Sequence, residues 1–103
     1  MADSPLQLST EQLVDVCSIL HQHLPQHEVR VFGSRARGQA KPYSDLDLVI
    51  MGDTPLPLDV LGQLTQAFAE SNLPWRVDLV DWATTSPEFR RHIQHSAQRL
   101  TPP

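Results

Sequence analysis

Cysteine is nearly absent from this sequence, because Cys17 is the single one among 103 residues. A lone cysteine cannot form an internal disulfide or begin a cysteine zinc site, so we expect a small buried side chain on a helix. Apolar runs are only a few residues long, which excludes a membrane-spanning helix. Residues 1–10 lack the basic start and apolar stretch of a secretory signal, so we expect a cytoplasmic protein.

Basic side chains are also scarce: 8 lysines and arginines stand against 12 aspartates and glutamates, and the net charge is −4. This balance argues against direct nucleic-acid binding, which needs a basic face. A length of 103 residues suits one domain, residues 1–103, and excludes folds that need a large substrate domain.

Nine prolines separate the apolar segments and mark the boundaries of the predicted elements. Ser9 with Gln12 predicts a capped helix start, Asp59 predicts a second, and Ser86 before a proline predicts a third. The predicted helices span 10–24, 59–71 and 87–99, and the predicted strands span 28–32, 45–51 and 76–81. This order predicts an α+β fold in which a small mixed β-sheet carries helices mainly on one face.

Two aspartates alternate with apolar residues along the second predicted strand. Leu46, Leu48 and Ile50 share one face of that strand, so Asp45 and Asp47 share the other, roughly 6–7 Å apart at Cα. Two carboxylates that close repel each other unless a cation lies between them, and oxygen ligands suit Mg²⁺. The plain alternative is a pair of solvated acids on an open sheet face.

A third aspartate on the next predicted strand favours the functional interpretation. If Val77 and Leu79 face the core, Asp78 lies on the open face beside the pair, whereas Asp81 points the other way or caps a loop. Three carboxylates on one sheet face are typical of a two-metal phosphoryl-transfer site.

The turn at 33–38 follows the first predicted strand and suits phosphate binding. Gly33 lets the backbone approach a ligand closely, and Ser34 is expected near the start of a short helix, where free N–H groups attract phosphate. Arg35 and Arg37 are candidate phosphate contacts; the alternative is that both pair with surface carboxylates.

Gly33-Ser34, followed by ten residues and then Asp45-Leu46-Asp47, resembles the signature of the DNA polymerase β-like nucleotidyltransferase superfamily. The segments 36–38 and 76–80 resemble its minimal nucleotidyltransferases, the MNT-domain or MntA-type antitoxins. The resemblance implies a nucleotidyltransferase fold and a Mg²⁺-dependent adenylyltransferase that uses ATP. It also implies a hetero-oligomer with a HEPN-domain ribonuclease toxin, which is silenced by transfer of AMP to a tyrosine.

The resemblance also assigns roles to residues of this sequence. Asp45 and Asp47 would bind two Mg²⁺ ions, and Asp78 would complete one metal site and accept the proton of the attacking hydroxyl. Gly33 and Ser34 would hold the β- and γ-phosphates of ATP. Two alternatives stay open: a binding antitoxin without catalysis, and a small-molecule nucleotidyltransferase.

Several other residues have plainer interpretations. The five histidines lack recognised metal-ligand spacing and are expected on solvated helix surfaces. Trp75 and Trp82 are expected to pack in or near the core, with a partner surface as the alternative. Tyr43 is expected to pack in its loop, although it could stack on an adenine.

Overall fold

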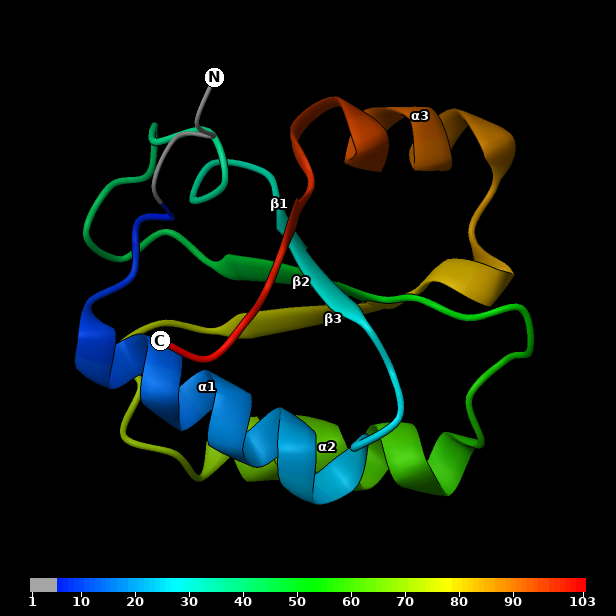
Figure 1. Cartoon of the computed structure of the whole chain (residues 1–103), viewed down its shortest axis with the longest axis horizontal. Helices are drawn as coiled ribbons and strands as arrows, with labels where there is room; N and C mark the ends of the chain where they lie inside the picture. Colours follow the sequence, from blue (N-terminus) through cyan, green and yellow to red (C-terminus); the bar gives the residue numbers. More distant parts are fainter. Residues whose placement is uncertain (1–5) are drawn as a thin grey trace.

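The computed structural model describes residues 6–103; Pro5 and the first half of the segment 1–10 lie outside the described residues. Helices and strands are interspersed along the chain, and β1 is followed directly by β2 (Figure 1). The elements are α1 (Thr10–His23), β1 (Val29–Phe32), β2 (Leu46–Ile50), α2 (Leu58–Ala69), β3 (Val77–Asp81), η1 (Trp82–Thr84), α3 (Pro87–Ser96) and β4 (Gln98–Arg99). In residues 6–103, no helix is long and apolar enough to cross a membrane.

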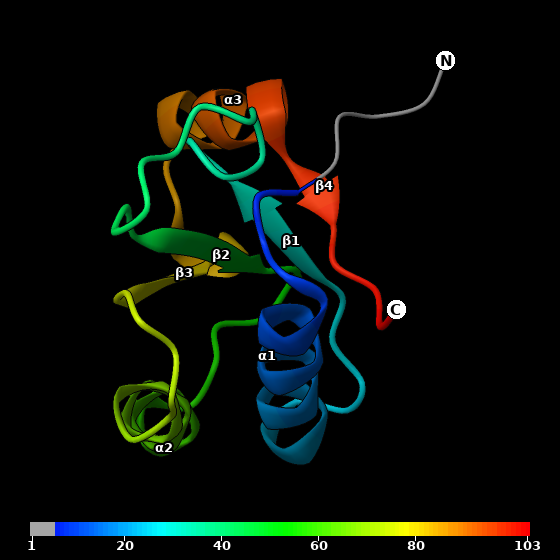
Figure 2. The same ribbon diagram turned by 90° about the vertical axis from the view of Figure 1, so that its left-hand side faces the viewer.

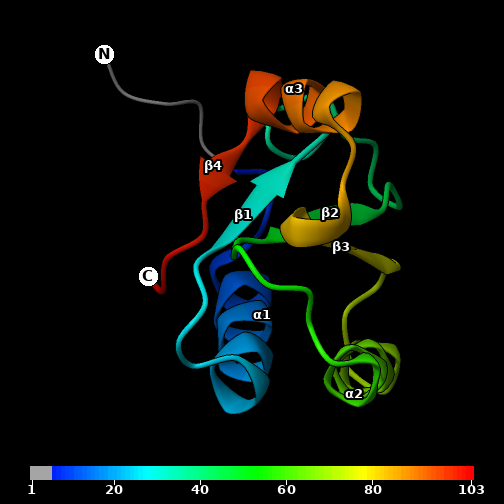
Figure 3. The same cartoon turned by 90° about the vertical axis from the view of Figure 1, so that its right-hand side faces the viewer.

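The strands form a mixed sheet in the order β3-β2-β1-β4, which confirms the predicted sheet type. β1 runs antiparallel to both β2 and β4, whereas β2 and β3 are parallel. The register places Phe32, Asp47 and Asp78 side by side across β1, β2 and β3. Figure 3 shows β4 lying beside β1 at the edge of the sheet. The register therefore fixes which side chains meet on each face.

Two helices cover one face of the sheet, as predicted. Figure 2 shows α1 and α2 side by side beneath the strands. The alternating residues Leu46, Leu48 and Ile50 point into this layer and are fully buried. The helices complete this core with Val16, Leu20, Leu64 and Phe68. The alternation of buried apolar residues along β2 therefore agrees with the sequence prediction.

The opposite face is only partly open, which corrects the expectation of a wholly solvated face. α3 lies on this side of the sheet in Figure 2. Its Ile93 packs on Phe32 and Val49 in a second small core. Val49 lies two residues after Asp47 on the same face of β2, so the covered part begins next to the acids.

The helix starts follow the predictions at two of the three sites. Ser9 and Gln12 form a reciprocal capping box at α1, and the Ser86 hydroxyl accepts the Phe89 N–H at α3. Asp59 is not a cap, because α2 begins at Leu58 after Pro57; Asp59 lies in the first turn instead, where its charge suits the helix dipole.

Two further expectations about elements are wrong. The last helix ends at Ser96 rather than at residue 99, because Ala97 adopts an extended backbone and residues 98–99 pair with β1 as β4. Residues 34–38 form successive turns rather than a short helix.

Candidate active site

Three aspartates gather on the part of this second sheet face that α3 leaves uncovered. Asp47 on β2 and Asp78 on β3 are direct neighbours in the parallel register. Asp45 lies one residue before β2 and shares the side of Asp47 by strand alternation. The structure therefore brings together the three carboxylates that strand parity predicted.

Arg76 bridges two of these aspartates. Its Nη2 lies 2.9 Å from Oδ2 of Asp45 and 3.7 Å from Oδ2 of Asp78. The hydrogen bond with Asp45 and the charges of Asp45 and Asp78 raise the pKa of Arg76 above its usual range. The Arg76 side chain is 72% exposed, so this ion pair is solvated and adds little to stability. The arginine thus provides a solvent-exposed counter-charge for the acids.

Asp47 lies deeper than its two neighbours. Burial raises the pKa of its carboxyl above the ordinary value, and the negative charges of Asp78 and Asp45 raise it further. The positive charges of Arg76 and His92 partly oppose this rise in pKa. The site therefore concentrates negative charge that a bound cation would stabilise.

The aspartates have the donor chemistry of a magnesium site, because their ligands are hard carboxylate oxygens. Within residues 6–103, no three acidic, histidine or cysteine side chains converge on one point as a preformed metal cage. Asp45 instead turns toward Arg76. Mg²⁺ commonly takes only one or two carboxylates and completes its shell with water and phosphate oxygens, so the residues fit this ion.

Gly33 follows β1 and lies directly against Asp47. Its φ of 74° belongs to the left-handed region that favours glycine. A Cβ atom at this position would overlap Oδ2 of Asp47. Its backbone N–H donates a 3.0 Å hydrogen bond to the Ser96 hydroxyl at the end of α3. Glycine is therefore required both by the turn and by the neighbouring carboxylate.

The turn after Gly33 presents two further candidate phosphate contacts. The carbonyl of Gly33 accepts the N–H groups of Ala36 and Arg37, which curls the chain tightly. Among the described residues, the Ser34 hydroxyl has no hydrogen-bond partner, so it is available to a ligand. Arg37 is exposed and lines a hollow of about 410 Å³ together with His95 and Ser96. Arg37 thus borders a polar hollow at the end of α3, and Gly33 contacts one of the residues that line it, Ser96.

Arg35 is not available as the phosphate contact that the sequence suggested, nor does it pair with a carboxylate. It is only 5% exposed. Its guanidinium donates to the carbonyls of Gln7, Pro42 and Ser44 at 2.8–3.1 Å. Its Cζ also lies 4.5 Å from the ring centre of Trp75, which confirms that this tryptophan packs in the core. Arg35 therefore holds the turn in place from within.

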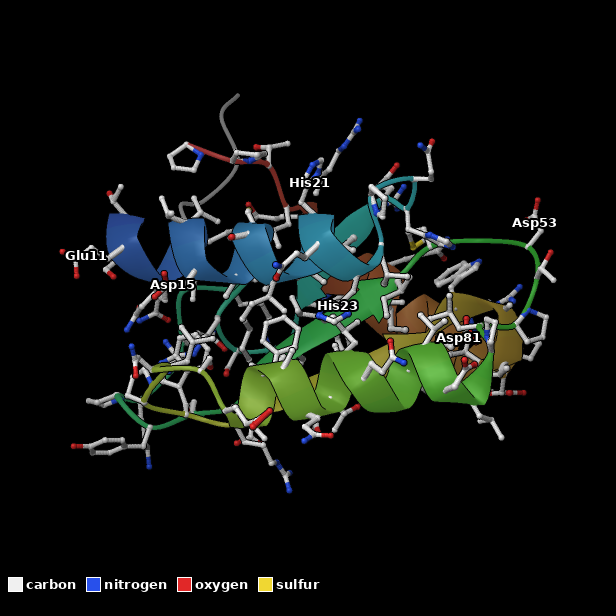
Figure 4. All side chains as sticks on the ribbon, turned by 90° about the horizontal axis from the view of Figure 1, so that it is seen from below. Glu11, Asp15, His21, His23, Asp53 and Asp81 are labelled. Carbon is white, nitrogen blue, oxygen red and sulfur yellow. The ribbon has the colours of Figure 1, made fainter. Side chains whose placement is uncertain are left out.

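Asp81 lies apart from the acidic site, on the side of the sheet covered by α2. Figure 4 shows its side chain near the start of α2, far from Glu11 and Asp15 at the other end of the molecule. Its carboxylate accepts the N–H of Leu56 at 2.8 Å and that of Ala83 at 3.3 Å. Asp81 therefore fixes a loop and caps η1. This agrees with the prediction that it points away from Asp78 or caps a loop.

Comparison with known proteins places this geometry in a family. The family model described as "Polymerase beta, Nucleotidyltransferase" matches residues 14–101. The chain is a polymerase β-type nucleotidyltransferase. This nucleotidyltransferase is 52% identical over 89 residues to a Haemophilus influenzae protein called "Probable protein adenylyltransferase MntA", a match that covers 86% of the chain and 78% of the relative.

Solved structures show the same fold. The nucleotidyltransferase superposes on a toxin-antitoxin structure with AMP-PNP at a TM-score of 0.73 and 24% identity, covering 93% of this chain and 75% of the other. A structure described as a "putative minimal nucleotidyltransferase" matches at a TM-score of 0.65 and 32% identity, over 89% and 96% of the two chains. A tri-AMPylated Shewanella oneidensis HEPN toxin complex with an MNT antitoxin matches at 0.67 and 21% identity, over 92% and 74%.

Sequence reasoning missed the part of the nucleotidyltransferase site that α3 supplies. Phe89, His92 and Ser96 recur at helical spacing, which is typical of one helix face. Ser96 contacts Gly33, and His92 is close enough to Asp47 to influence its pKa. The spacing could have shown a shared face. It could not show that this face borders the acids, because that depends on how α3 packs.

Proposed function

We propose that this nucleotidyltransferase is an antitoxin that transfers AMP from ATP to a tyrosine of a HEPN-domain toxin. The observation that carries the proposal is the row of Asp45, Asp47 and Asp78 beside the Gly33 turn. Support also comes from the 52% identical Haemophilus influenzae relative, which is called "Probable protein adenylyltransferase MntA". Structural relatives include a complex of an MNT antitoxin with an AMPylated HEPN toxin.

Each site residue has a distinct task in this reaction. Asp45 and Asp47 would hold two Mg²⁺ ions, and Asp78 would complete one of the two metal sites. Bound Mg²⁺ would supply positive charge against the triphosphate and the developing charge of the leaving group. Ser34 donates a hydrogen bond to the β- and γ-phosphates. The Gly33 backbone lets these phosphates approach closely, and the charge of Arg37 attracts them.

The transfer exchanges the phosphoanhydride bond between the α- and β-phosphates of ATP for a phosphodiester bond to the acceptor oxygen. The acceptor oxygen forms a bond to the α-phosphorus of ATP while the bond between that phosphorus and the bridging oxygen breaks. Pyrophosphate leaves, and Asp78 receives the proton of the acceptor hydroxyl. Most of the rate enhancement comes from positioning and charge stabilisation, because the protein forms no covalent bond with the phosphate.

A protein acceptor suits the surroundings of Asp78. This side chain is exposed and belongs to β3, which lies at the edge of the sheet. A folded partner can therefore bring a tyrosine to the acids from beyond β3. The net charge of −4 does not favour a nucleic acid in this position.

Mass spectrometry tests the proposal directly. The chain is incubated with ATP, Mg²⁺ and the product of the neighbouring gene as the candidate HEPN protein, and separately with free tyrosine or RNA. We expect one or more AMP units on a tyrosine of the HEPN protein and none in the Asp45→Asn variant. Labelling of RNA or free tyrosine, with the HEPN protein unmodified, would reject a protein acceptor.

Neutralisation of the toxin separates catalysis from simple binding. If Asp45→Asn forms the complex and still silences the toxin as well as the unaltered chain, the antitoxin works by contact alone. We expect the variant to bind the toxin and to leave its ribonuclease active after the complex is diluted.

A further inference from the structure

Two aromatic side chains on α3 form a surface that the proposed chemistry does not use. Phe89 is 39% exposed although it is a large apolar residue. The imidazole of His92, one turn later, stacks on the Phe89 ring with 5.8 Å between ring centres and 25° between planes. Both residues are exposed on the helix surface. Exposed aromatic rings offer a stacking surface for a further planar group.

This aromatic pair borders the acidic site. Phe89 packs edge-on against Phe32, with 6.1 Å between ring centres. Phe32 is the direct neighbour of Asp47 across the sheet and immediately precedes Gly33. His92 is near enough to Asp47 for its charge to act on that carboxyl. The pair therefore stands on the β1 side of the acids.

The layout of the site separates ATP, which donates AMP, from the hydroxyl that accepts it. The phosphate-binding turn begins at Gly33, and α3 packs over β1, so both lie on one side of Asp47. Asp78, which faces the acceptor, lies on the other side in β3. A nucleotide with its α-phosphate at the acids and its β- and γ-phosphates at the turn must direct its nucleoside elsewhere. The turn contacts α3 at Ser96, and the exposed rings of His92 and Phe89 lie one and two turns earlier on the same helix.

We propose that Phe89 and His92 bind the purine ring of ATP by stacking. This inference rests on the proposed function, because it needs ATP at the acids and the turn. It assigns a role in nucleotide binding to α3, which adds ring contacts to the polar contacts of the turn. Stacking on aromatic side chains accepts any planar base, so these residues contribute affinity for the nucleoside rather than strict selection of adenine.

Calorimetry with two probes isolates the base contact. Binding of AMP-PNP, which carries the base, is compared with binding of inorganic tripolyphosphate, which lacks it, both with Mg²⁺. We expect Phe89→Leu and His92→Ala each to weaken AMP-PNP binding by about tenfold and to leave tripolyphosphate binding unchanged. Phe89→Leu keeps an apolar contact with Phe32, and His92→Phe, which keeps a ring, should retain most of the affinity.

Two further variants make the test decisive. His21, an exposed histidine on α1, is the matched control, and His21→Ala should bind both probes normally. Tyr43 is 80% exposed, which corrects the expectation that it packs in its loop, and it is the competing stacking residue. A loss of AMP-PNP affinity in Tyr43→Leu, with none in Phe89→Leu, would overturn the proposal.

The two proposals fail in different ways. If the unaltered chain binds neither AMP-PNP nor tripolyphosphate, the proposed function is wrong. If it binds both, and the α3 variants bind AMP-PNP normally, only the stacking role is wrong. An equal loss of both probes in the α3 variants would also reject stacking, because it would indicate a disturbed phosphate site.

Discussion

Arg35 and Arg37 are two residues apart, yet they have opposite environments. Arg35 is enclosed by three backbone carbonyls, whereas Arg37 is exposed beside the Ser96 end of α3. Removing a buried charged donor leaves its acceptors unsatisfied. We therefore expect Arg35→Ala to lower the free energy of unfolding by about 2–4 kcal/mol. Urea denaturation followed by circular dichroism measures this change.

Arg37→Ala is the matched variant for this prediction. It should unfold like the unaltered chain and weaken binding of tripolyphosphate by about tenfold, because a charged contact to phosphate is lost. If Arg35→Ala kept full stability and lost only phosphate binding, Arg35 would be a phosphate contact and not a structural residue.

Asp47 should be essential for activity without being essential for the fold. Burial and the neighbouring carboxylates raise its pKa, which means that its charged form is disfavoured in the folded protein. We expect Asp47→Asn to abolish AMP transfer, while the metal-free protein melts at the same temperature or slightly higher. Melting in EDTA measures stability, and mass spectrometry measures transfer. Asp59→Asn, at an exposed acid on α2, should keep its activity.

The three aspartates could be predicted from the sequence, whereas the role of Arg35 could not. Alternation along β2 and β3 requires Asp47 and Asp78 to share a face once Leu46 and Leu48 are buried. The partners of Arg35 are carbonyls, which every residue carries, and one belongs to Gln7 at the start of the described chain. Residue spacing contains no signal for such contacts.

At the scale of elements, the end of β1 depends on two glycines with positive φ. Gly33 and Gly38 have nearly the same φ, 74° and 72°, so alanine at either site costs about 1–2 kcal/mol of backbone strain. Only at Gly33 would the added Cβ overlap Asp47. We expect Gly33→Ala to lose AMP transfer and Gly38→Ala to retain it, at similar melting temperatures. Equal activity in both would show that the contact with Asp47 is unimportant.

The alternation of side chains along β3 gives a second prediction at the scale of elements. Asp78 faces the acids, whereas Asp81 accepts backbone N–H groups from Leu56 and Ala83. Asp81→Ala should therefore lower the free energy of unfolding by about 1–2 kcal/mol and keep most of the transfer activity. Asp78→Ala should show the reverse pattern. Chemical denaturation and a transfer assay measure both variants. If Asp81→Ala lost activity and Asp78→Ala lost stability, the assignment of the two faces of β3 would be wrong.

Most element boundaries followed from capping residues and prolines, but the end of the chain did not. Residues 98–99 have no strand-like pattern of their own and extend only because Arg30 and Val31 of β1 offer a free edge. The position of α3 is likewise set by the contact of Ile93 with Phe32 and Val49. Both features depend on tertiary packing, which local propensity cannot show.

At the scale of the whole molecule, ligand binding should stabilise the fold. Residues from β1, β2, β3 and α3 line one site, so a bound nucleotide links elements that otherwise separate on unfolding. At one hundred times its Kd, ATP with Mg²⁺ should add about 2.7 kcal/mol, or roughly 10–20 °C in Tm. Thermal melting with and without EDTA checks this increase. The Asp45→Asn variant should show little of it, and a full increase there would contradict metal-assisted binding.

The carbonyl cage around Arg35 has a thermodynamic consequence for nucleotide recognition. The cage ties the turn to Gln7 on one side and to Pro42 and Ser44 on the other, so the backbone proposed to bind the phosphates is held in place without a ligand. Ordering a flexible loop normally opposes association, and that entropic cost is largely absent here. If the turn binds phosphate as proposed, it is a preorganised receptor, and we expect its association rate to be limited by encounter rather than by loop rearrangement.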